Sequence, residues 1–146
     1  RLHQGTVGML VALLIPGALM LPFVPREWRT GWEQLAVEVS KLKPDFVVGR
    51  EYHLASQMGY QLRPLPAVEY TAVGQPSKAF PHWWRPEAFA GRDAVVVTDA
   101  KHYPEEQAWI AAAFERVDEP IPVFVVRFGG AREEFWLVRS RGYRYR

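Results

Sequence analysis

The amino-acid sequence predicts an α/β fold in which a transmembrane helix, residues 1–25, precedes a water-facing α/β domain, residues 26–146. Three observations support this prediction. The chain opens on an uncharged apolar stretch, short apolar runs rich in β-branched residues alternate with helical periodicity, and two apolar runs near the end flank a Gly-Gly pair. This order favours a small, mostly parallel sheet covered by helices and closed by a C-terminal antiparallel hairpin.

The apolar opening has the length of a membrane span. Residues 5–24 carry no charged side chain, and their one polar side chain is Thr6. Twenty helical residues extend over about 30 Å, the thickness of the hydrocarbon core of a bilayer. A signal or anchor sequence and a buried core helix remain as alternatives. Because Pro16-Gly17 is tolerated among neighbouring membrane helices and the chain opens on Arg1, we expect the last span of a larger protein.

Two helices and two strands are predicted between the apolar opening and residue 74. Residues 30–44 begin with a capping box, Thr30 and Glu33, and end at a proline. Residues 45–49 are a β-branched run typical of a buried strand, residues 51–62 are amphipathic, and residues 67–73 alternate as a strand does. The apolar faces expected on the two helices are Trp32, Leu35, Ala36, Val39 and Leu42 on the first, and Leu54, Ala55, Met58 and Leu62 on the second.

The second half of the domain is predicted to continue from a structured loop into a strand, a helix and a hairpin. Residues 74–93 form the loop, and residues 94–99 form a buried strand. Pro104 suits the first turn of a helix over residues 104–117, whose expected apolar face is Trp109, Ile110, Ala113, Phe114 and Val117. Apolar runs over 121–128 and 132–140 then flank Gly129-Gly130-Ala131, which predicts a hairpin.

Composition excludes several classes of chemistry. The formal net charge is only +2, so we expect no nucleic-acid partner. The chain has no cysteine, which rules out disulfides, thiolate metal sites and a cysteine nucleophile. Nucleotide, P-loop and metalloprotease motifs are missing and the four histidines are scattered, so we expect neither a cofactor nor a metal. The basic ending "RSRGYRYR" suits either lipid phosphates or a solvated strand end.

Candidate binding residues follow the two predicted buried strands, because ligands of such sheets meet the carboxyl ends of the strands. Arg50 and Tyr52 suit a phosphate or a hydroxyl, with a salt bridge to Glu51 as the alternative role of Arg50. After the second strand, "DAKHYPEE" gathers groups suited to proton transfer: Asp99, Lys101, His102, Glu105 and Glu106. Equally, Asp99 caps a turn and the two glutamates favour a helix N-terminus.

The motif "FPHWWRP" places two indole rings beside Arg85. Rings next to a cation suit the face of a sugar or the edge of a membrane. Packing of Trp83 or Trp84 into the core is the alternative.

Motifs spread over nearly the whole chain resemble the C-terminal region of bacterial family 39 glycosyltransferases, the membrane enzymes related to protein mannosyltransferases and the lipid A aminoarabinose transferase. They are "GWEQLAVEV", "DFVVGREYHLASQMGYQL", "PSKAFPHWWRPEAFAGRDAVVVTD" and "FWLVRSRGYR" after a membrane helix. The more specific pieces are Tyr52 with Leu54-Ala55-Ser56, and Ser77 followed by the tryptophans and Gly91-Arg92-Asp93. The chain departs from the pattern at Gln57 and at Lys78-Ala79.

The resemblance implies transfer of a sugar from a polyprenyl-phosphate carrier to an acceptor at the outer face of the cytoplasmic membrane. The catalytic carboxylates of the family lie near the N-terminus of the full protein, and no position here matches them. We expect residues 26–146 to be extracytoplasmic, to roof the site and to help select the acceptor. The expected substrate-binding residues are Arg50, Tyr52, Ser77, Trp83, Trp84 and Asp99.

The partners implied by this resemblance are the lipid-linked sugar donor, an acceptor, membrane lipid and the remaining transmembrane part of the same protein. A rival hypothesis is a singly anchored periplasmic binding module that uses the same strand-end loops without catalysis. A third, a soluble hydrolase, rests on the "DAKHYPEE" cluster alone.

Overall fold

A computed structural model describes residues 31–70, 84–126, 130 and 132–145. The predicted transmembrane helix therefore lies outside the described residues, as do Thr30, Ser77 and Trp83. Among the helices that are described, none combines the length and the hydropathy needed to cross a bilayer.

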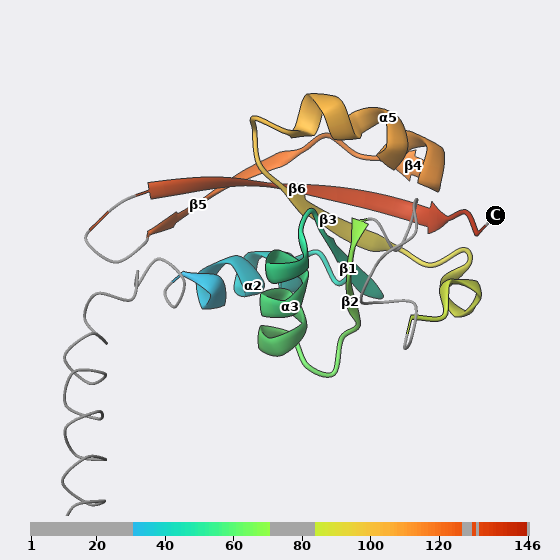
Figure 1. The fold of residues 1–146 in the computed structure, drawn as a ribbon, viewed down its shortest axis with the longest axis horizontal. Coiled ribbons are helices and arrows are strands. Elements are labelled where there is room, and N and C mark those ends of the chain that lie inside the picture. The colour runs from blue at the N-terminus through green and yellow to red at the C-terminus, as the bar shows by residue number, and fades with distance from the viewer. Residues whose placement is uncertain (1–30, 71–83, 127–129, 131, 146) are drawn as a thin grey trace, which may run out of the picture.

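Helices and strands alternate through most of the described chain, which ends in three consecutive strands (Figure 1). The helices are α2 (Trp32–Lys41), α3 (Tyr52–Gln61) and α5 (Tyr103–Ala113), with a short 3-10 helix η4 (Pro86–Phe89). The strands are β1 (Phe46–Gly49), β2 (Ala67–Glu69), β3 (Ala94–Thr98), β4 (Phe114–Val117), β5 (Ile121–Val126) and β6 (Arg132–Tyr143). The predicted α/β class is confirmed.

The six strands form one mixed sheet in the order β2-β1-β3-β6-β4, with β5 also paired to β6. Strand β1 runs parallel to β2 and β3, whereas β6 runs antiparallel to β3, β4 and β5. Of the six strands, β6 therefore runs against the other five. The antiparallel pairing of β5 with β6 confirms the predicted C-terminal hairpin.

Strands β4 and β5 behave as one long edge strand that is interrupted by a bulge. Val117 pairs with Ser140 and Ile121 with Leu137, so residues 118–120 stand opposite residues 138–139. One extra residue on the edge strand is the signature of a β-bulge. The pairing continues through it, because the Asp118 N–H donates to the Arg139 carbonyl at 2.9 Å.

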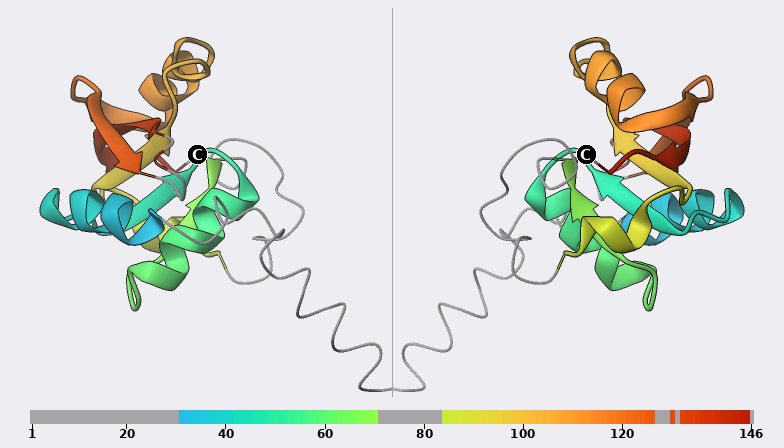
Figure 2. Two further views of the ribbon diagram at one scale, coloured as in Figure 1. Left: turned by 90° about the vertical axis from the view of Figure 1, so that its left-hand side faces the viewer. Right: turned by 90° about the vertical axis from the view of Figure 1, so that its right-hand side faces the viewer.

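The sheet carries an apolar core on each face, and helices cover both (Figures 1 and 2). Alternation along β1 sends Phe46 and Val48 to one face and Val47 to the other. The first face packs on α5, and the second packs on α2 and α3. The expected apolar faces of α2 and α3 are confirmed, since Trp32, Leu35, Ala36, Val39, Leu54, Ala55 and Met58 are buried.

Two details of the predicted helices are wrong. The helix expected over 104–117 ends at Ala113, and its last four residues form β4 instead. These four residues fit a helix by their apolar spacing and a strand by their composition, because Phe114 and Val117 are strand formers. Pairing with the end of β6 makes them a strand. The N-cap of α2 is Gly31 with φ 89°, one residue after the predicted Thr30, which lies outside the described residues.

Candidate functional site

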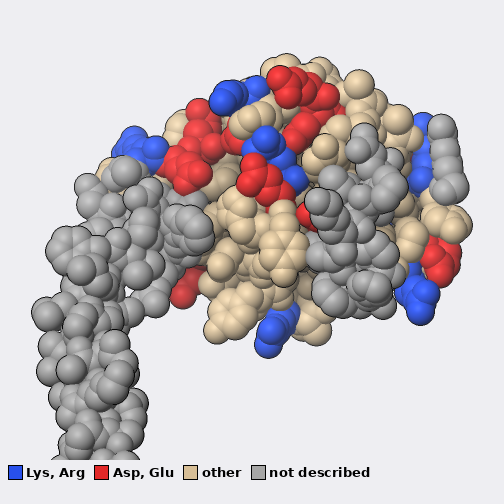
Figure 3. Space-filling view, in the orientation of Figure 1, with Lys and Arg blue, Asp and Glu red and all other residues tan. Residues whose placement is uncertain are grey.

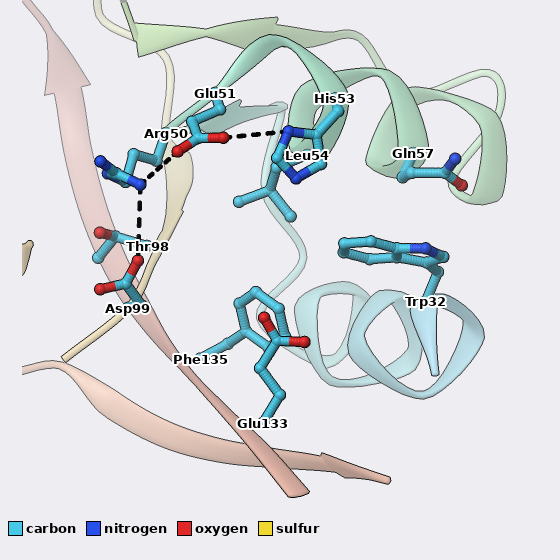
Figure 4. A pocket seen from close by; sticks show the side chains of 10 residues that line it. All are labelled: Trp32, Arg50, Glu51, His53, Leu54, Gln57, Thr98, Asp99, Glu133 and Phe135. Carbon is cyan, nitrogen blue, oxygen red and sulfur yellow. Dashed lines mark hydrogen bonds and ion pairs between the residues drawn. The ribbon is translucent and has the colours of Figure 1, made fainter. Parts of the chain in front are cut away.

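A pocket of about 440 Å³ opens at the carboxyl edge of β1 and β3, the place where the order of the elements predicted a ligand site. The first turns of α2 and α3 and the start of β6 complete its walls (Figure 4). Ten residues line it: Trp32, Arg50, Glu51, His53, Leu54, Gln57, Thr98, Asp99, Glu133 and Phe135.

The sharp turn from β1 into α3 is made possible by Gly49. A side-chain Cβ at this position would lie 2.5 Å from the backbone nitrogen of Ala55 and 2.8 Å from its Cα. Only glycine lets the end of β1 come so close to the first turn of α3. This contact fixes Arg50 and Glu51, which follow at once, at the mouth of the pocket.

Arg50 is held by three carboxylates. Its Nε lies 3.1 Å from Glu106 Oε1, and its Nη1 lies 3.7 Å from Asp99 Oδ2. The same Nη1 donates to Glu51. A guanidinium offers five donors in a planar fork, so a single side chain can join three acids from separate elements. Arg50 thereby connects the end of β1 to the end of β3 and to α5.

Asp99 arranges the turn that leads from β3 into α5. Its Oδ1 accepts the backbone N–H groups of Lys101 and His102, each at 3.0 Å. Its two carboxylate oxygens also lie 2.7 and 2.8 Å from Nδ1 of His102. Burial alone would raise the pKa of Asp99, but the hydrogen bonds with His102 and the charges of His102 and Arg50 hold that pKa below its ordinary value.

Glu106 is the buried acid of the site. Only 6% of its surface is exposed, and it accepts a hydrogen bond from the Thr98 hydroxyl. Burial raises the pKa of Glu106 above its ordinary value, although the Thr98 hydroxyl and the charge of Arg50 act in the opposite direction. A buried carboxyl with a raised pKa, one turn into a helix, is well placed to change its protonation when its surroundings change.

The opposite wall of the pocket is aromatic and apolar. The Trp32 ring lies 6.0 Å from the Phe135 ring and 6.4 Å from the His53 ring, measured between centroids. Figure 4 shows Trp32 and His53 across the pocket from Arg50, with Leu54 and Phe135 between them. Trp32 and Phe135 are each 5% exposed, so their rings form the buried base of the pocket, its aromatic floor, and do not project into it.

The lining is acidic on balance. Three carboxylates, Glu51, Asp99 and Glu133, stand against the single guanidinium of Arg50, and Glu106 lies directly behind it. On the face shown in Figure 3, most acidic residues lie in the upper part, where Lys and Arg side chains stand singly beside them. An anionic ligand would meet net repulsion here, whereas neutral or cationic ligands would not. Within the described residues, no group of three or more His, Cys, Asp or Glu has an arrangement that could hold a metal ion.

The structure brings together two of the predicted binding residues. Arg50 and Asp99 both line the pocket. Tyr52 begins α3 and is 54% exposed, but it does not line the pocket. Trp84 packs in the core of the other sheet face, with its ring centroid 4.2 Å from Phe89 and 5.4 Å from Phe46. For Trp84 the structure thus shows the alternative role, core packing.

The alternative roles given above for Arg50, a salt bridge, and for Asp99, the capping of a turn, are also observed. Arg50 does pair with Glu51, and Asp99 does cap a turn. These contacts coexist with a place in the pocket lining. A structural bond and a binding role are therefore compatible for both residues.

Sequence reasoning missed most of the pocket, because eight of the ten lining residues were not among the predicted binding residues. Trp32 was assigned to a helix face, which is correct, but nothing in the helical pattern indicates that its ring also borders a cavity. Glu133 and Phe135 belong to the start of β6, which runs past the end of β3 because Thr98 pairs with Trp136. The apolar run over 132–140 is longer than the run over 94–99, and this difference is the sequence signal that could have revealed the extension.

Comparison of the chain with protein-family models, with curated proteins and with solved structures found no match. The interpretation of this site therefore depends on its own geometry and on the motif resemblance described above.

Proposed function

We propose that the pocket binds a neutral, hydroxyl-rich acceptor, and that the chain is the C-terminal portion of a membrane glycosyltransferase. The observation that carries this proposal is the pairing, in one pocket, of an aromatic floor of Trp32 and Phe135 with a polar wall that contains Arg50, Glu51 and Asp99. Sugar sites combine these two features, because a sugar ring has apolar C–H faces and a rim of hydroxyls.

The polar wall offers both acceptors and donors to such a ligand. Carboxylates accept hydrogen bonds from hydroxyls, and the Gln57 side chain, on the α3 side of the pocket, provides an amide that can donate or accept. Glu133 enters from the start of β6, so hydroxyls on opposite sides of a ring would meet different elements of the fold.

The charge of the lining supports an acceptor more than the lipid-linked donor. A polyprenyl-phosphate sugar carries negative charge, and three lining carboxylates against one guanidinium disfavour it. In this proposal the donor stays in the bilayer, and the catalytic groups come from the part of the protein that precedes this chain. Residues 26–146 lie on the extracytoplasmic side of the cytoplasmic membrane and roof the site.

Sugar titrations of the purified chain test the binding part of the proposal. Neutral mono- and oligosaccharides are expected to quench or shift tryptophan fluorescence, and the corresponding sugar phosphates are expected to bind more weakly. Glu133→Gln should weaken binding by about tenfold, the cost of one hydrogen bond to a charged group. The matched control is Glu87→Gln, an exposed acid in η4. Binding that prefers the phosphates, or equal affinity in both variants, would contradict the proposal.

The transferase part is tested against the rival hypothesis, a singly anchored binding module with the same pocket. An antibody against residues 26–146 reports the mass of the native protein in host membranes. A species several times larger than 16.8 kDa that resists carbonate extraction supports a multi-span transferase. A species of about that size, together with sugar binding, would favour the binding module.

A further inference from the structure

The hairpin of β5 and β6 exposes an apolar face that nothing in the described residues covers. Pro122, Phe124 and Val126 lie at alternate positions of β5 and are all exposed, Phe124 by 58% and Val126 by 46%. Alternation directs the intervening Val123 and Val125 to the core beneath, where α2 packs. We call the outward set, Pro122, Phe124 and Val126, the hairpin face.

The cross-strand neighbours of this face on β6 are one indole and two charged side chains. Pro122 stands opposite Trp136, Phe124 opposite Glu134, and Val126 opposite Arg132. The Trp136 indole N–H donates to Glu134 Oε1 at 2.7 Å, so the indole nitrogen has its hydrogen-bond partner. The hairpin face is therefore a surface of aromatic and aliphatic groups bordered by the Trp136 indole and by two charged residues, Glu134 and Arg132, a mixed composition suited to the interfacial zone of a membrane.

The far end of the hairpin is fixed beside the start of α2. The backbone N–H of Val126 donates to the side-chain oxygen of Gln34 at 3.3 Å, and Gln34 lies in the first turn of α2. Figure 1 shows this end of the hairpin and the beginning of α2 on the same side of the molecule, away from the C-terminus. This end of the hairpin therefore lies next to the start of α2.

The chain length before α2 limits how far the hairpin can be from a membrane. The uncharged stretch ends at Val24, and only residues 25–31 separate it from Trp32. Seven residues reach at most about 25 Å even when fully extended. A bilayer adds an interfacial zone of about 5 to 8 Å on each side of its hydrocarbon core, which shortens the gap further. An anchored chain thus keeps the hairpin near the lipid surface.

We propose that the hairpin face docks on the lipid surface and orients the domain over the membrane. This inference rests on the proposed function in one respect, the membrane anchoring of residues 5–24. The hairpin face adds a second contact with lipid to that of the anchor. One membrane span alone leaves the domain free to rotate, whereas two contacts fix its orientation relative to the bilayer. The pocket at the carboxyl edge then keeps a defined position relative to the bilayer.

Site-directed spin labelling of the whole chain tests this docking. Because the chain has no cysteine, Phe124→Cys and Val126→Cys each give a single labelling site. The matched control is Tyr60→Cys on α3, where the native side chain is 64% exposed. The labelled chain is reconstituted in vesicles of phosphatidylethanolamine and phosphatidylglycerol. Labels at 124 and 126 should be severalfold more accessible to oxygen than to a water-soluble nickel chelate, relative to the label at 60.

Vesicle flotation separates failure of the docking from failure of the anchor. A chain that does not float with the vesicles contradicts membrane anchoring, and the docking inference fails with it. A chain that floats, but whose labels at 124 and 126 match the label at 60, overturns the docking alone. Dipolar broadening between labels at 124 on two copies would also overturn it, because a second copy of the chain would then cover the face.

Discussion

Nε of Arg50 lies 3.1 Å from Oε1 of Glu106, and this pair joins the end of β1 to the first half of α5 across the carboxyl edge of the sheet. The pair is asymmetric in its surroundings, because the Glu106 side chain is 8% exposed and the Arg50 side chain is 24% exposed. Burying an acid costs free energy that a partner offsets only in part. Substitutions of Arg50 and of Glu106 are therefore expected to change the free energy of unfolding in opposite directions.

Arg50→Ala is expected to lower the free energy of unfolding by about 2 to 3 kcal/mol, since it leaves Glu106 and Asp99 without their cation. Urea unfolding followed by tryptophan fluorescence measures the loss. Arg85→Ala, at an exposed position before η4, is the matched control and should change stability by less than about 0.5 kcal/mol. Similar losses in the two variants would show that Arg50 does not hold the edge together.

Glu106→Gln is expected to become more stable relative to the native chain as the pH rises. The folded state holds the proton of Glu106 more tightly than the unfolded state, whose pKa is near 4.5. The native chain therefore loses stability as the pH rises from that value through the raised folded pKa, and the loss persists above it. Glutamine cannot ionise and avoids this loss.

Unfolding free energies of both proteins, measured from acid to neutral pH, give the difference that isolates Glu106. Asp99 titrates with the opposite sign, because its lowered pKa contributes stability that is lost as the pH falls through it. Its contribution is present in both proteins, so the difference retains only the coupling by which the charge of Asp99 raises the pKa of Glu106. If Glu106→Gln instead became less stable than the native chain as the pH rises, the ion pair with Arg50 would outweigh the cost of burying the Glu106 carboxylate.

Thr98→Val is expected to raise the pKa of Glu106 further. The Thr98 hydroxyl donates to this carboxylate and lowers its pKa, and valine keeps the shape of the side chain without the donor. The carboxyl carbon of Glu106, followed by NMR during a pH titration, reports the change. Loss of the hydrogen bond should also cost about 1 to 2 kcal/mol in stability. An unchanged titration would mean that the hydroxyl does not act on the ionised form.

Local sequence signals were sufficient for the parts of this fold that depend on neighbours in the chain. The β-branched runs predicted β1 and β3, and apolar periodicity predicted the buried faces of α2 and α3. The strand-end rule then placed Arg50 and Asp99 at one edge, and the structure confirms that they meet there. Each of these inferences needs only residues close in sequence or a general rule of parallel sheets.

The parts that depend on distant partners were not predictable. Phe114 to Val117 continue the helical pattern of α5, and they form a strand because the end of β6 offers them a ladder. Likewise Phe135 borders the pocket because β6 extends past the end of β3, a matter of register between segments far apart in the chain. Apolar periodicity reports which side of an element is buried, not which element covers it.

Gly49→Ala and Gly91→Ala test two different requirements for glycine, the close approach of another backbone segment at Gly49 and a positive φ at Gly91. At Gly49 a methyl group would meet the Ala55 backbone nitrogen at 2.5 Å, so the first turn of α3 must move and a loss of about 3 kcal/mol is expected. At Gly91, where φ is 75°, no described atom lies within 4 Å of the added Cβ, so only backbone strain of about 1 kcal/mol is expected. Urea unfolding of both variants measures the two losses. Equal losses would show that α3 can shift without strain, in which case Gly49 would not be what fixes Arg50 at the mouth of the pocket.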